Sequence, residues 1–392
     1  MNQSEALQPR LNRIQQWSLI VGGTGVLLSL VGAFISREQF FQSYLFGYLF
    51  WVSIALGCVA VTMLHHVTGG AWSFTIRRLA ESGAMTLLLM AVLFIPILLG
   101  INQLYLWARP EIVAESVLVQ HKAPYLNVPF FIVRAVIYFA IWIGLAYLLN
   151  KWSLEQDQDN TAAPSLTNRL RSLSAPGLIL YVLTASFAAF DWMMSLEPEW
   201  FSSIYGLLFI AGNALATIAF VIIGVALLAN YAPLAQWVSA NIYNDLGNFL
   251  LAFVAFWAYI SFSQFLIIWS ANLPEEVGWY IVRTQGGWQW LAMALIFLHF
   301  ALPMVILLAR WAKRRVRILM AIAAFVLVMQ LAAIFWLVMP AFHPLGFHLH
   351  WLDLVLPVAI GGLWLAFFSW QLQKKSLVPL HDPRFKEAPA HD

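Results

Sequence analysis

Residues 203–229, SIYGLLFIAGNALATIAFVIIGVALLA, form an apolar run that contains no charged side chain. About 20 such residues let a helix cross roughly 30 Å of hydrocarbon. Apolar runs of this kind recur along the chain, near 17–35, 41–64, 82–101, 129–149, 176–195, 203–229, 246–269, 288–310, 316–339 and 351–371. Of all residues, 62% are hydrophobic and only 10% are charged. The sequence therefore predicts an all-α polytopic membrane protein with ten transmembrane helices.

The distribution of Lys and Arg predicts the orientation, because positively charged loops stay on the cytoplasmic side of a membrane. With the N-terminus inside, sixteen of the 21 Lys and Arg residues fall on inside segments. The outside loops hold Arg37, Arg109, Lys122 and Arg283, and Arg134 falls inside the fourth span. Both termini are therefore expected to be cytoplasmic. The first span lacks a convincing cleavage site, so we expect it to be retained as an anchor.

The polar loop 150–175 divides a single membrane domain, 1–392, into two halves. Aligning the second span with the sixth superposes Ser43 on Ser202 and Gly47 on Gly206, which indicates a weak repeat. If the repeat is real, spans 2–5 and spans 6–9 are two like-oriented four-helix bundles, flanked by spans 1 and 10. The corresponding ranges are 1–40 for the N-terminal segment and span 1, 41–155 and 176–195 for the first bundle, 201–340 for the second, 351–371 for span 10, and 372–392 for a cytoplasmic tail.

Several kinds of chemistry are excluded within this polypeptide. Its one cysteine, Cys58, lies in an apolar run, so the chain has no disulfide, no Cys-ligated zinc and no iron-sulfur cluster of its own. The sequence has no CxxCH motif for covalent haem, no glycine-rich nucleotide fingerprint and no HExxH motif. The loops are also too short to bury a soluble catalytic core. Any redox centres are expected on other subunits.

The segment 190–201, FDWMMSLEPEWF, places Asp191, Glu197 and Glu199 among aromatic residues at a membrane boundary. If the fifth span begins near Pro176, Asp191 lies inside the hydrocarbon, where a charge costs about 2.5 to 3.5 kcal/mol. Its functional interpretation is a proton acceptor or a quinone-headgroup partner, with the two glutamates as an outward relay. The alternative is a structural acid neutralised from another span, for example by Arg134.

Further candidates for a proton pathway lie in the eighth span and on the inner side. His299 is near the middle of its span, and Pro303 removes the hydrogen bond that the His299 carbonyl would accept. His299 could therefore belong to a proton path, or, equally, it could be a core histidine that bonds to a neighbour. The segment 65–82, HHVTGGAWSFTIRRLAES, adds His65, His66 and Glu81. These residues could admit protons or bind a partner protein, or they could form a basic anchor in which Glu81 offsets Arg77 or Arg78.

At the outer side, His343, His348, His350 and Asp353 lie close in sequence. This spacing is compatible with proton exchange or a metal, but histidines are ordinary at a membrane interface, and we expect no metal site. An alternative quinone-binding pocket at this face would use Asp191, Trp192, Trp200, His343 and Asp353, since quinone sites combine apolar walls with a few polar groups.

Three segments carry a resemblance to a known family: HHVTGGAWSFTIRR at 65–78, PYLNVPFFIVRAVIYF at 124–139 and SFAAFDWMMSLEPEWFSSIYG at 186–206. They resemble the NrfD/PsrC (polysulfide reductase membrane subunit) family. Within this family, the chain is similar to the second of the two quinone-binding-type membrane proteins of the bacterial alternative complex III. That complex is a quinol:electron-acceptor oxidoreductase, and the similarity extends over essentially all ten spans.

The resemblance implies a protein of the bacterial inner membrane that packs against the other, homologous NrfD-like membrane protein of the complex. It also implies partner subunits that carry iron-sulfur clusters and c-type haems, a quinone that is menaquinone or ubiquinone, and no nucleic acid. The chain would then support assembly and proton movement without a redox centre of its own, so it is not expected to be catalytic in isolation. A stand-alone secondary transporter is the alternative from another class, although its spans would be expected to carry more polar groups at midplane.

Overall fold

The computed structural model describes residues 3–70, 73–158, 163–379 and 382, and every regular element in these residues is a helix. Ten of its helical spans are long and apolar enough to cross a membrane, which confirms the ten predicted spans. The first five spans are α1 (Gln3–Ile35), α2 (Arg37–Thr68), a set of three helices α3 (Phe74–Ala84), α4 (Leu87–Val92) and α5 (Ile95–Leu99), α9 (Val128–Gln158) and α10 (Ala163–Trp192). The next five are α11 (Tyr205–Leu228), α12 (Ala240–Ala271), the set α14 (Trp288–Ala294), η5 (Leu295–Ala301) and α15 (Leu302–Leu308), α17 (Val316–Val338) and α18 (Leu352–Leu372).

Two spans are interrupted. The third bends at turns near Met85 and Leu93, and the Thr86 hydroxyl there donates to the carbonyl of Gly83 (2.6 Å). In the eighth span, η5 is a π-helix that ends just before Pro303. Because proline has no N–H, the helical ladder is disturbed around His299, and a π-helical turn accommodates the change.

Helices α2 and α11 form the centre of the protein. Within their most apolar windows, 89% of α2 and 72% of α11 are buried. Helix α2 packs against α3, α10, α11 and α18, whereas α11 packs against α2, α10, α12 and α17. These two spans are therefore shielded from lipid by the spans around them.

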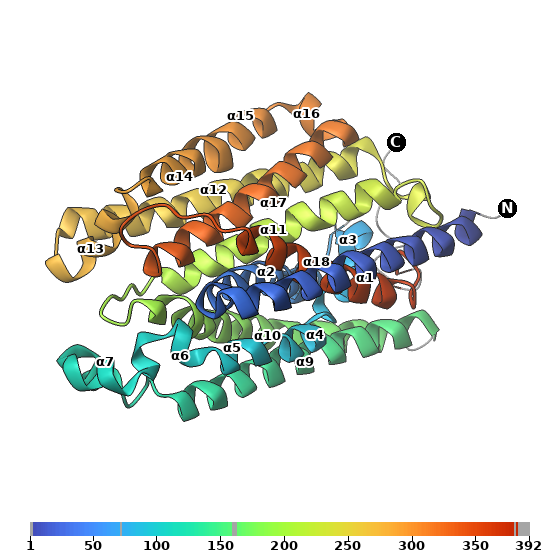
Figure 1. Cartoon of the computed structure of the whole chain (residues 1–392). Helices are drawn as coiled ribbons and strands as arrows, with labels where there is room; N and C mark the ends of the chain where they lie inside the picture. The colour runs from blue at the N-terminus through green and yellow to red at the C-terminus, as the bar shows by residue number, and fades with distance from the viewer. Residues whose placement is uncertain (1–2, 71–72, 159–162, 380–381, 383–392) are drawn as a thin grey trace.

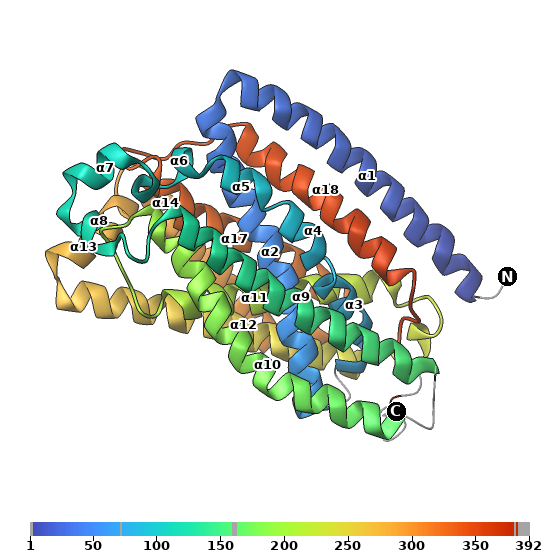
Figure 2. The same ribbon diagram turned by 90° about the horizontal axis from the view of Figure 1, so that it is seen from below.

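Helix α1 lies at the edge and packs along α18, as Figure 2 shows. Only 22% of its apolar window is buried. Glycines allow the close approach: a Cβ on Gly25 would lie 2.7 Å from the Cβ of Ala359, and one on Gly362 would lie 2.4 Å from the backbone nitrogen of Gly22. Backbone contact of this kind replaces the hydrophobic driving force that is missing between helices in lipid.

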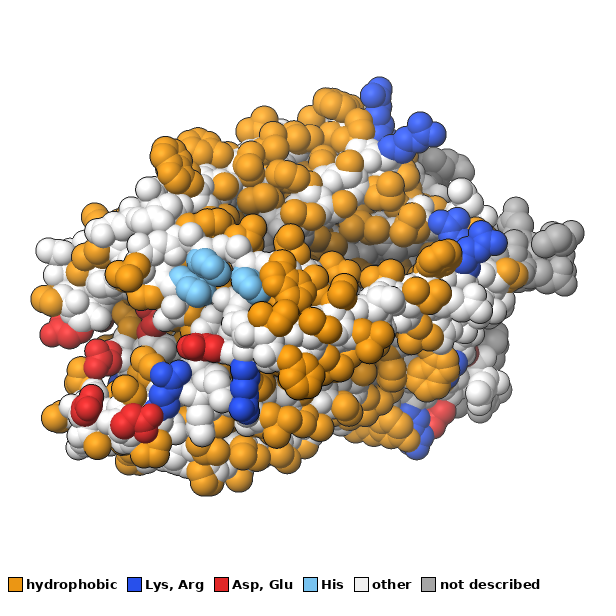
Figure 3. Space-filling view, viewed as in Figure 1, with side chains coloured by type: hydrophobic (Ala, Val, Ile, Leu, Met, Phe, Trp, Pro, Cys, Tyr) orange, Lys and Arg blue, Asp and Glu red, His pale blue; other side chains and the backbone are white. Residues whose placement is uncertain are grey.

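The two ends of the helical body differ in charge. The basic end holds the start of α1, the end of α18, α3 and α16 (Arg310–Arg314), and the acidic end holds α7 (Pro110–Glu115), α8 (Val117–Lys122) and α13 (Pro274–Arg283) (Figures 1 and 2). In Figure 3, acidic side chains gather at the left, acidic end, and an orange apolar surface covers much of the middle. The net charge of the surface thus changes from one end of the helices to the other.

The helices extend beyond the predicted spans. Most of the predicted loop 150–175 is helical, because α9 continues to Gln158 and α10 begins at Ala163. Pro176 therefore lies inside α10, not in its first turn as predicted; prolines are tolerated inside transmembrane helices because neighbouring groups satisfy the backbone. Residues 159–162 of that loop, and 380–381 and 383–392 of the predicted tail, lie outside the described residues.

Candidate functional site: buried charge clusters at both ends

Asp191 lies in the last turn of α10 and is fully buried. Its carboxylate accepts hydrogen bonds from Nε (2.8 Å) and Nη2 (2.9 Å) of Arg134 in α9, and from the Tyr138 hydroxyl (2.8 Å). The structure thus confirms Arg134 as the partner that the sequence suggested. A bidentate arginine offsets part of the cost of taking both charges out of water, and the third donor adds to this.

The other side of the Arg134 guanidinium is also satisfied. Its Nη1 donates to the backbone oxygen of Tyr125 (2.8 Å), and its Cζ lies 3.9 Å from the centre of the Tyr125 ring and 4.4 Å from that of Phe130. Cation–π contacts of this kind are strongest where water is excluded. The pair therefore joins α9, α10 and the loop before α9 into one unit that is held together by charge.

The two glutamates of the same segment have partners of their own. Glu197 accepts from Nη2 of Arg283 (2.8 Å), and Glu199, which is exposed, accepts from the Ser116 hydroxyl (3.1 Å). The three acids of the predicted relay, Asp191, Glu197 and Glu199, thus bond to different partners. Whether protons pass along it stays a prediction.

Arg283 was not among the predicted site residues, although its side chain is fully buried. It stacks on Trp279, with Cζ 3.5 Å from the ring centre, and donates to the Leu337 carbonyl (3.0 Å). Trp279 in turn stacks on Trp200, with ring centres 4.7 Å apart. The sequence signal was an arginine four residues after a tryptophan in a loop otherwise poor in bases.

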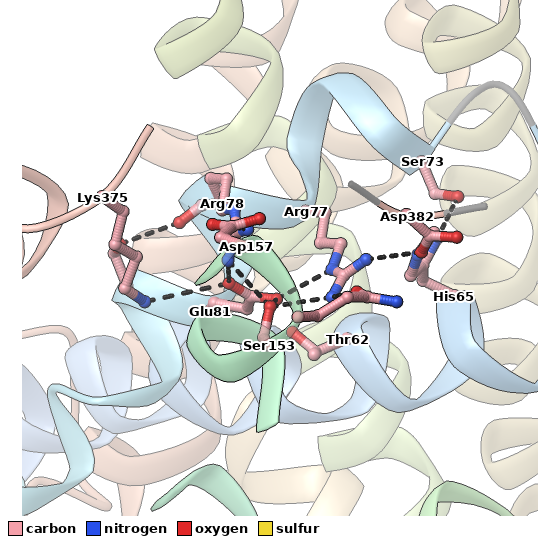
Figure 4. Close-up of polar contacts among 12 residues, drawn as sticks. Thr62, His65, Ser73, Arg77, Arg78, Glu81, Ser153, Asp157, Lys375 and Asp382 are labelled. Atoms are coloured by element: carbon pink, nitrogen blue, oxygen red, sulfur yellow. Dashed lines mark hydrogen bonds and ion pairs between the residues drawn. The ribbon is translucent and has the colours of Figure 1, made fainter. Parts of the chain in front are cut away.

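A larger cluster lies at the basic end (Figure 4). Glu81 in α3 pairs with Nε of Arg77 (2.8 Å) and Nη1 of Arg78 (2.8 Å), and it accepts from the Ser153 hydroxyl of α9 (2.5 Å). Arg78 also pairs with Asp157. Glu81 thus pairs with both arginines, whereas the alternative interpretation of this segment required only one of them.

The segment after α18 completes this cluster. Asp382 accepts from Nη1 of Arg77 (2.7 Å), and Nζ of Lys375 lies 3.9 Å from Oε2 of Glu81. The segment thus contributes one acid and one base to a buried set of three cations and three anions, Arg77, Arg78, Lys375, Glu81, Asp157 and Asp382. Residues more than 300 positions apart in sequence therefore meet here.

The histidines at the start of this segment are both buried at the end of α2. Nδ1 of His65 lies 2.5 Å from the Ser73 hydroxyl, and its ring contacts those of His66 and Phe74. They border the turn between α2 and α3, next to the cluster around Glu81, as Figure 4 shows for His65.

His299 is fully buried and separate from these clusters. Its Nε2 lies 3.1 Å from Oε1 of Gln330 in α17, and its ring packs edge-on against Trp257, with centres 4.3 Å apart. Its Nδ1 has no partner in the described part of the chain. The geometry is that of a core histidine bonded to a side-chain amide, and a proton path through it stays a prediction.

Asp353, in the first turn of α18 at the acidic end, is buried. It accepts from the Ser43 hydroxyl (2.5 Å), the Gln39 amide (3.3 Å) and the backbone N–H of His350 (2.8 Å). These bonds tie α18 to the start of α2.

The rings of His343, His348 and His350 form a row, with centres 4.6 Å and then 6.2 Å apart. Burial, and then the neighbouring His348, lower the pKa of His343, although Asp353 and Glu38 oppose the shift. In the described residues, no group of three or more His, Cys, Asp or Glu side chains is arranged to hold a metal ion.

The residues of the alternative quinone pocket are dispersed. A cavity of about 390 Å³ at the acidic end is lined by Trp200, Tyr125, Phe190, Met194 and Phe201 with His121 and Lys122, and of the five predicted residues it contains Trp200 alone. Trp192 is instead a core residue that contacts Tyr48 and Phe94. Asp191, His343 and Asp353 have the separate surroundings described above.

A scan against protein-family models matches no family, and a search of curated proteins finds no match for this chain.

Proposed function

We propose that this chain is an integral membrane subunit of a respiratory quinol:electron-acceptor oxidoreductase of the alternative complex III type. The observation that carries the proposal is a meeting of two of the resembling segments. Arg134 and Tyr138 come from 124–139, Asp191 comes from 186–206, and the three side chains bond directly in a buried site. Two of the segments that carry the resemblance are thus joined in space by these three side chains.

Within such a complex the chain would support assembly and proton movement, without a redox centre of its own. Its single cysteine supports this role, because iron-sulfur clusters are held mainly by cysteine thiolates. Buried ionisable groups at both ends, around Asp191 and around Glu81, support a part in proton movement, since such groups in membrane spans commonly mark proton relays.

The proposal includes the arrangement in the membrane. Spans 2–5 and 6–9 would be the two four-helix bundles of the family, with spans 1 and 10 beside them. The basic end, with both termini, would face the cytoplasm of a bacterium, since the positive-inside rule places it there. The partners would be the homologous NrfD-like membrane protein, an iron-sulfur protein and multihaem c-type cytochromes.

Purification in mild detergent through a tag on the C-terminus tests membership of the complex. In the assembled complex, the Asp191→Asn variant then tests the proton role. Unchanged quinol oxidation and unchanged proton release in that variant would remove Asp191 from the mechanism. A chain that purifies alone and folded would instead favour a transporter.

A second candidate within the same complex gives the chain its own quinone pocket. The cavity beside Trp200 favours it, because aromatic walls surround Lys122, whose pKa is lowered by burial although Glu199 opposes the shift. A light-activated quinone analogue should then label residues 190–201. Labelling confined to other proteins of the complex would exclude this pocket.

A further inference from the structure

Lys375 is the one base that the segment after α18 contributes to the cluster at the basic end. It follows α18 by three residues, and its side chain is only 1% exposed. Figure 4 shows its Nζ directed toward Glu81. An ammonium group carries three donors, so its burial is favourable only when acceptors surround it.

The surroundings of Lys375 do not provide those acceptors. Its Nζ has no hydrogen-bond partner among the described residues. The nearest carboxylate oxygen, Oε2 of Glu81, lies 3.9 Å away and already accepts from Arg78 at 2.8 Å. Lys375 can therefore lose its proton without breaking any hydrogen bond shown in the structure.

The other bases of the cluster differ in this respect. Arg77 donates to Glu81, Asp382, Ser153 and Gln156, and Arg78 donates to Glu81, Ser153 and Asp157. Guanidinium groups also keep their proton at any ordinary pH. Lys313, the other largely buried lysine at this end, donates to Oδ1 of Asn248 (2.7 Å). Among these bases, Lys375 thus has a side chain that can titrate and also has the fewest hydrogen-bond partners.

We propose that Lys375 is a proton-exchange site at the basic end, with Glu81 as its counter-ion. The ammonium loses its proton toward the aqueous side of this end and becomes a neutral amine, and the amine later takes a proton back. Four charged groups face it, Glu81, Arg77 and Arg78 from α3 and Asp157 from α9. The Asp157 side chain is 22% exposed and bonds Arg78, so it links the buried cluster to the aqueous side.

The electrostatics agree with this geometry. Burial, followed by Arg78 and Arg77, lowers the pKa of Lys375 to about 8, although Glu81 and Asp157 raise it. Between that value and the ordinary lysine pKa, an unfolded chain holds the proton and the folded chain does not. The stability that Lys375 confers therefore rises with pH across this window and falls as pH drops through about 8.

The test compares unfolding temperatures of the purified protein between pH 7 and pH 9.5, read by tryptophan fluorescence. Relative to Lys375→Met, which cannot titrate, the wild type should gain roughly 4 °C across this range. Lys375→Arg stays charged, so its unfolding temperature should be lower than that of the wild type above pH 8. Lys313→Met is the matched control, because it removes a largely buried lysine from the same end whose ammonium has a hydrogen-bond partner, Asn248.

Parallel curves for the wild type and Lys375→Met would overturn the proposal. If Lys375→Met does not fold, parallel curves for the wild type and Lys375→Arg overturn it equally. The inference deepens the proposed proton role and rests on it. The titration of Lys375 is measured on the purified chain. A negative result there is therefore distinguishable from a failure of the chain to copurify with redox proteins.

Discussion

Asp191 in α10 faces Arg134 in α9, and each oxygen of the carboxylate accepts from a different nitrogen of the guanidinium, at 2.8 and 2.9 Å. Both side chains are almost completely shielded from water. Neither charge can be removed alone without leaving the other buried and unpaired. The pair therefore locks two helices together, and it is also where the proposed proton role is most directly tested.

The Asp191→Asn variant should be destabilised by roughly 3 to 5 kcal/mol, because Arg134 loses its counter-ion in a buried place. Thermal unfolding in detergent measures this. Glu199→Gln is the control, since Glu199 is exposed and its loss should change little. A double variant, Arg134→Met with Asp191→Leu, should recover much of the loss. Equal unfolding temperatures for Asp191→Asn and the wild type would contradict the role given to the pair.

The contact between α1 and α18 should fail when a methyl group is added at Gly25. Its Cβ would lie 2.7 Å from the Cβ of Ala359 and 2.8 Å from the backbone Cα, so the helices must move apart. We expect Gly25→Ala to cost about 1 to 3 kcal/mol. Gly23→Ala is the matched control, since a Cβ there meets nothing within 4 Å. Similar unfolding temperatures for the two variants would show that close packing at Gly25 is unimportant.

The segment after α18 should detach more readily in Asp382→Asn, because Arg77 loses the carboxylate that Nη1 contacts at 2.7 Å. Limited trypsin digestion should then cleave faster at Lys374 and Lys375, as read from the mass of the N-terminal fragment that remains. Glu155→Gln is the control, because the Glu155 side chain is 43% exposed and its pairing with Lys151 is long, at 4.0 Å. Unchanged cleavage in Asp382→Asn would mean that the ion pair does not hold this segment.

The bond between His299 and Gln330 can be tested by Gln330→Leu. This change keeps a similar volume but leaves Nε2 of His299 buried without its partner, at an expected cost of about 1 to 3 kcal/mol. Adding His299→Leu should restore part of the stability, because both polar groups are then gone. If the double variant is less stable than Gln330→Leu, His299 contributes through contacts other than this bond.

Much of the fold was predictable because a membrane constrains helix length and charge so strongly. The run 203–229 has to be a helix in lipid, and α11 occupies most of it. The breaks in the third and eighth spans were harder to place. Pro303 marked the disturbance around His299, but no residue near Met85 indicates a bend as clearly.

The candidate site was predictable only where a charged residue inside a span needs a partner of opposite charge. Asp191 inside a span requires a cation, and Arg134 was the one Lys or Arg well inside a predicted span, since Arg310 and Arg317 lie at the ends of theirs. Arg283 with Glu197, and Asp382 with Arg77, were not predictable, because each residue taken alone resembles an ordinary loop or tail charge. Their pairing depends on packing between segments that are distant in sequence, which periodicity does not encode.

The measurement that tests the central claim most directly is the composition of the protein as it leaves the membrane. Membranes are solubilised in mild detergent, the chain is purified through a C-terminal tag, and the sample is analysed for its proteins, haem and iron. We predict copurification with multihaem c-type cytochromes and iron-sulfur proteins in a coloured complex. A single colourless chain that remains folded would contradict the proposed function.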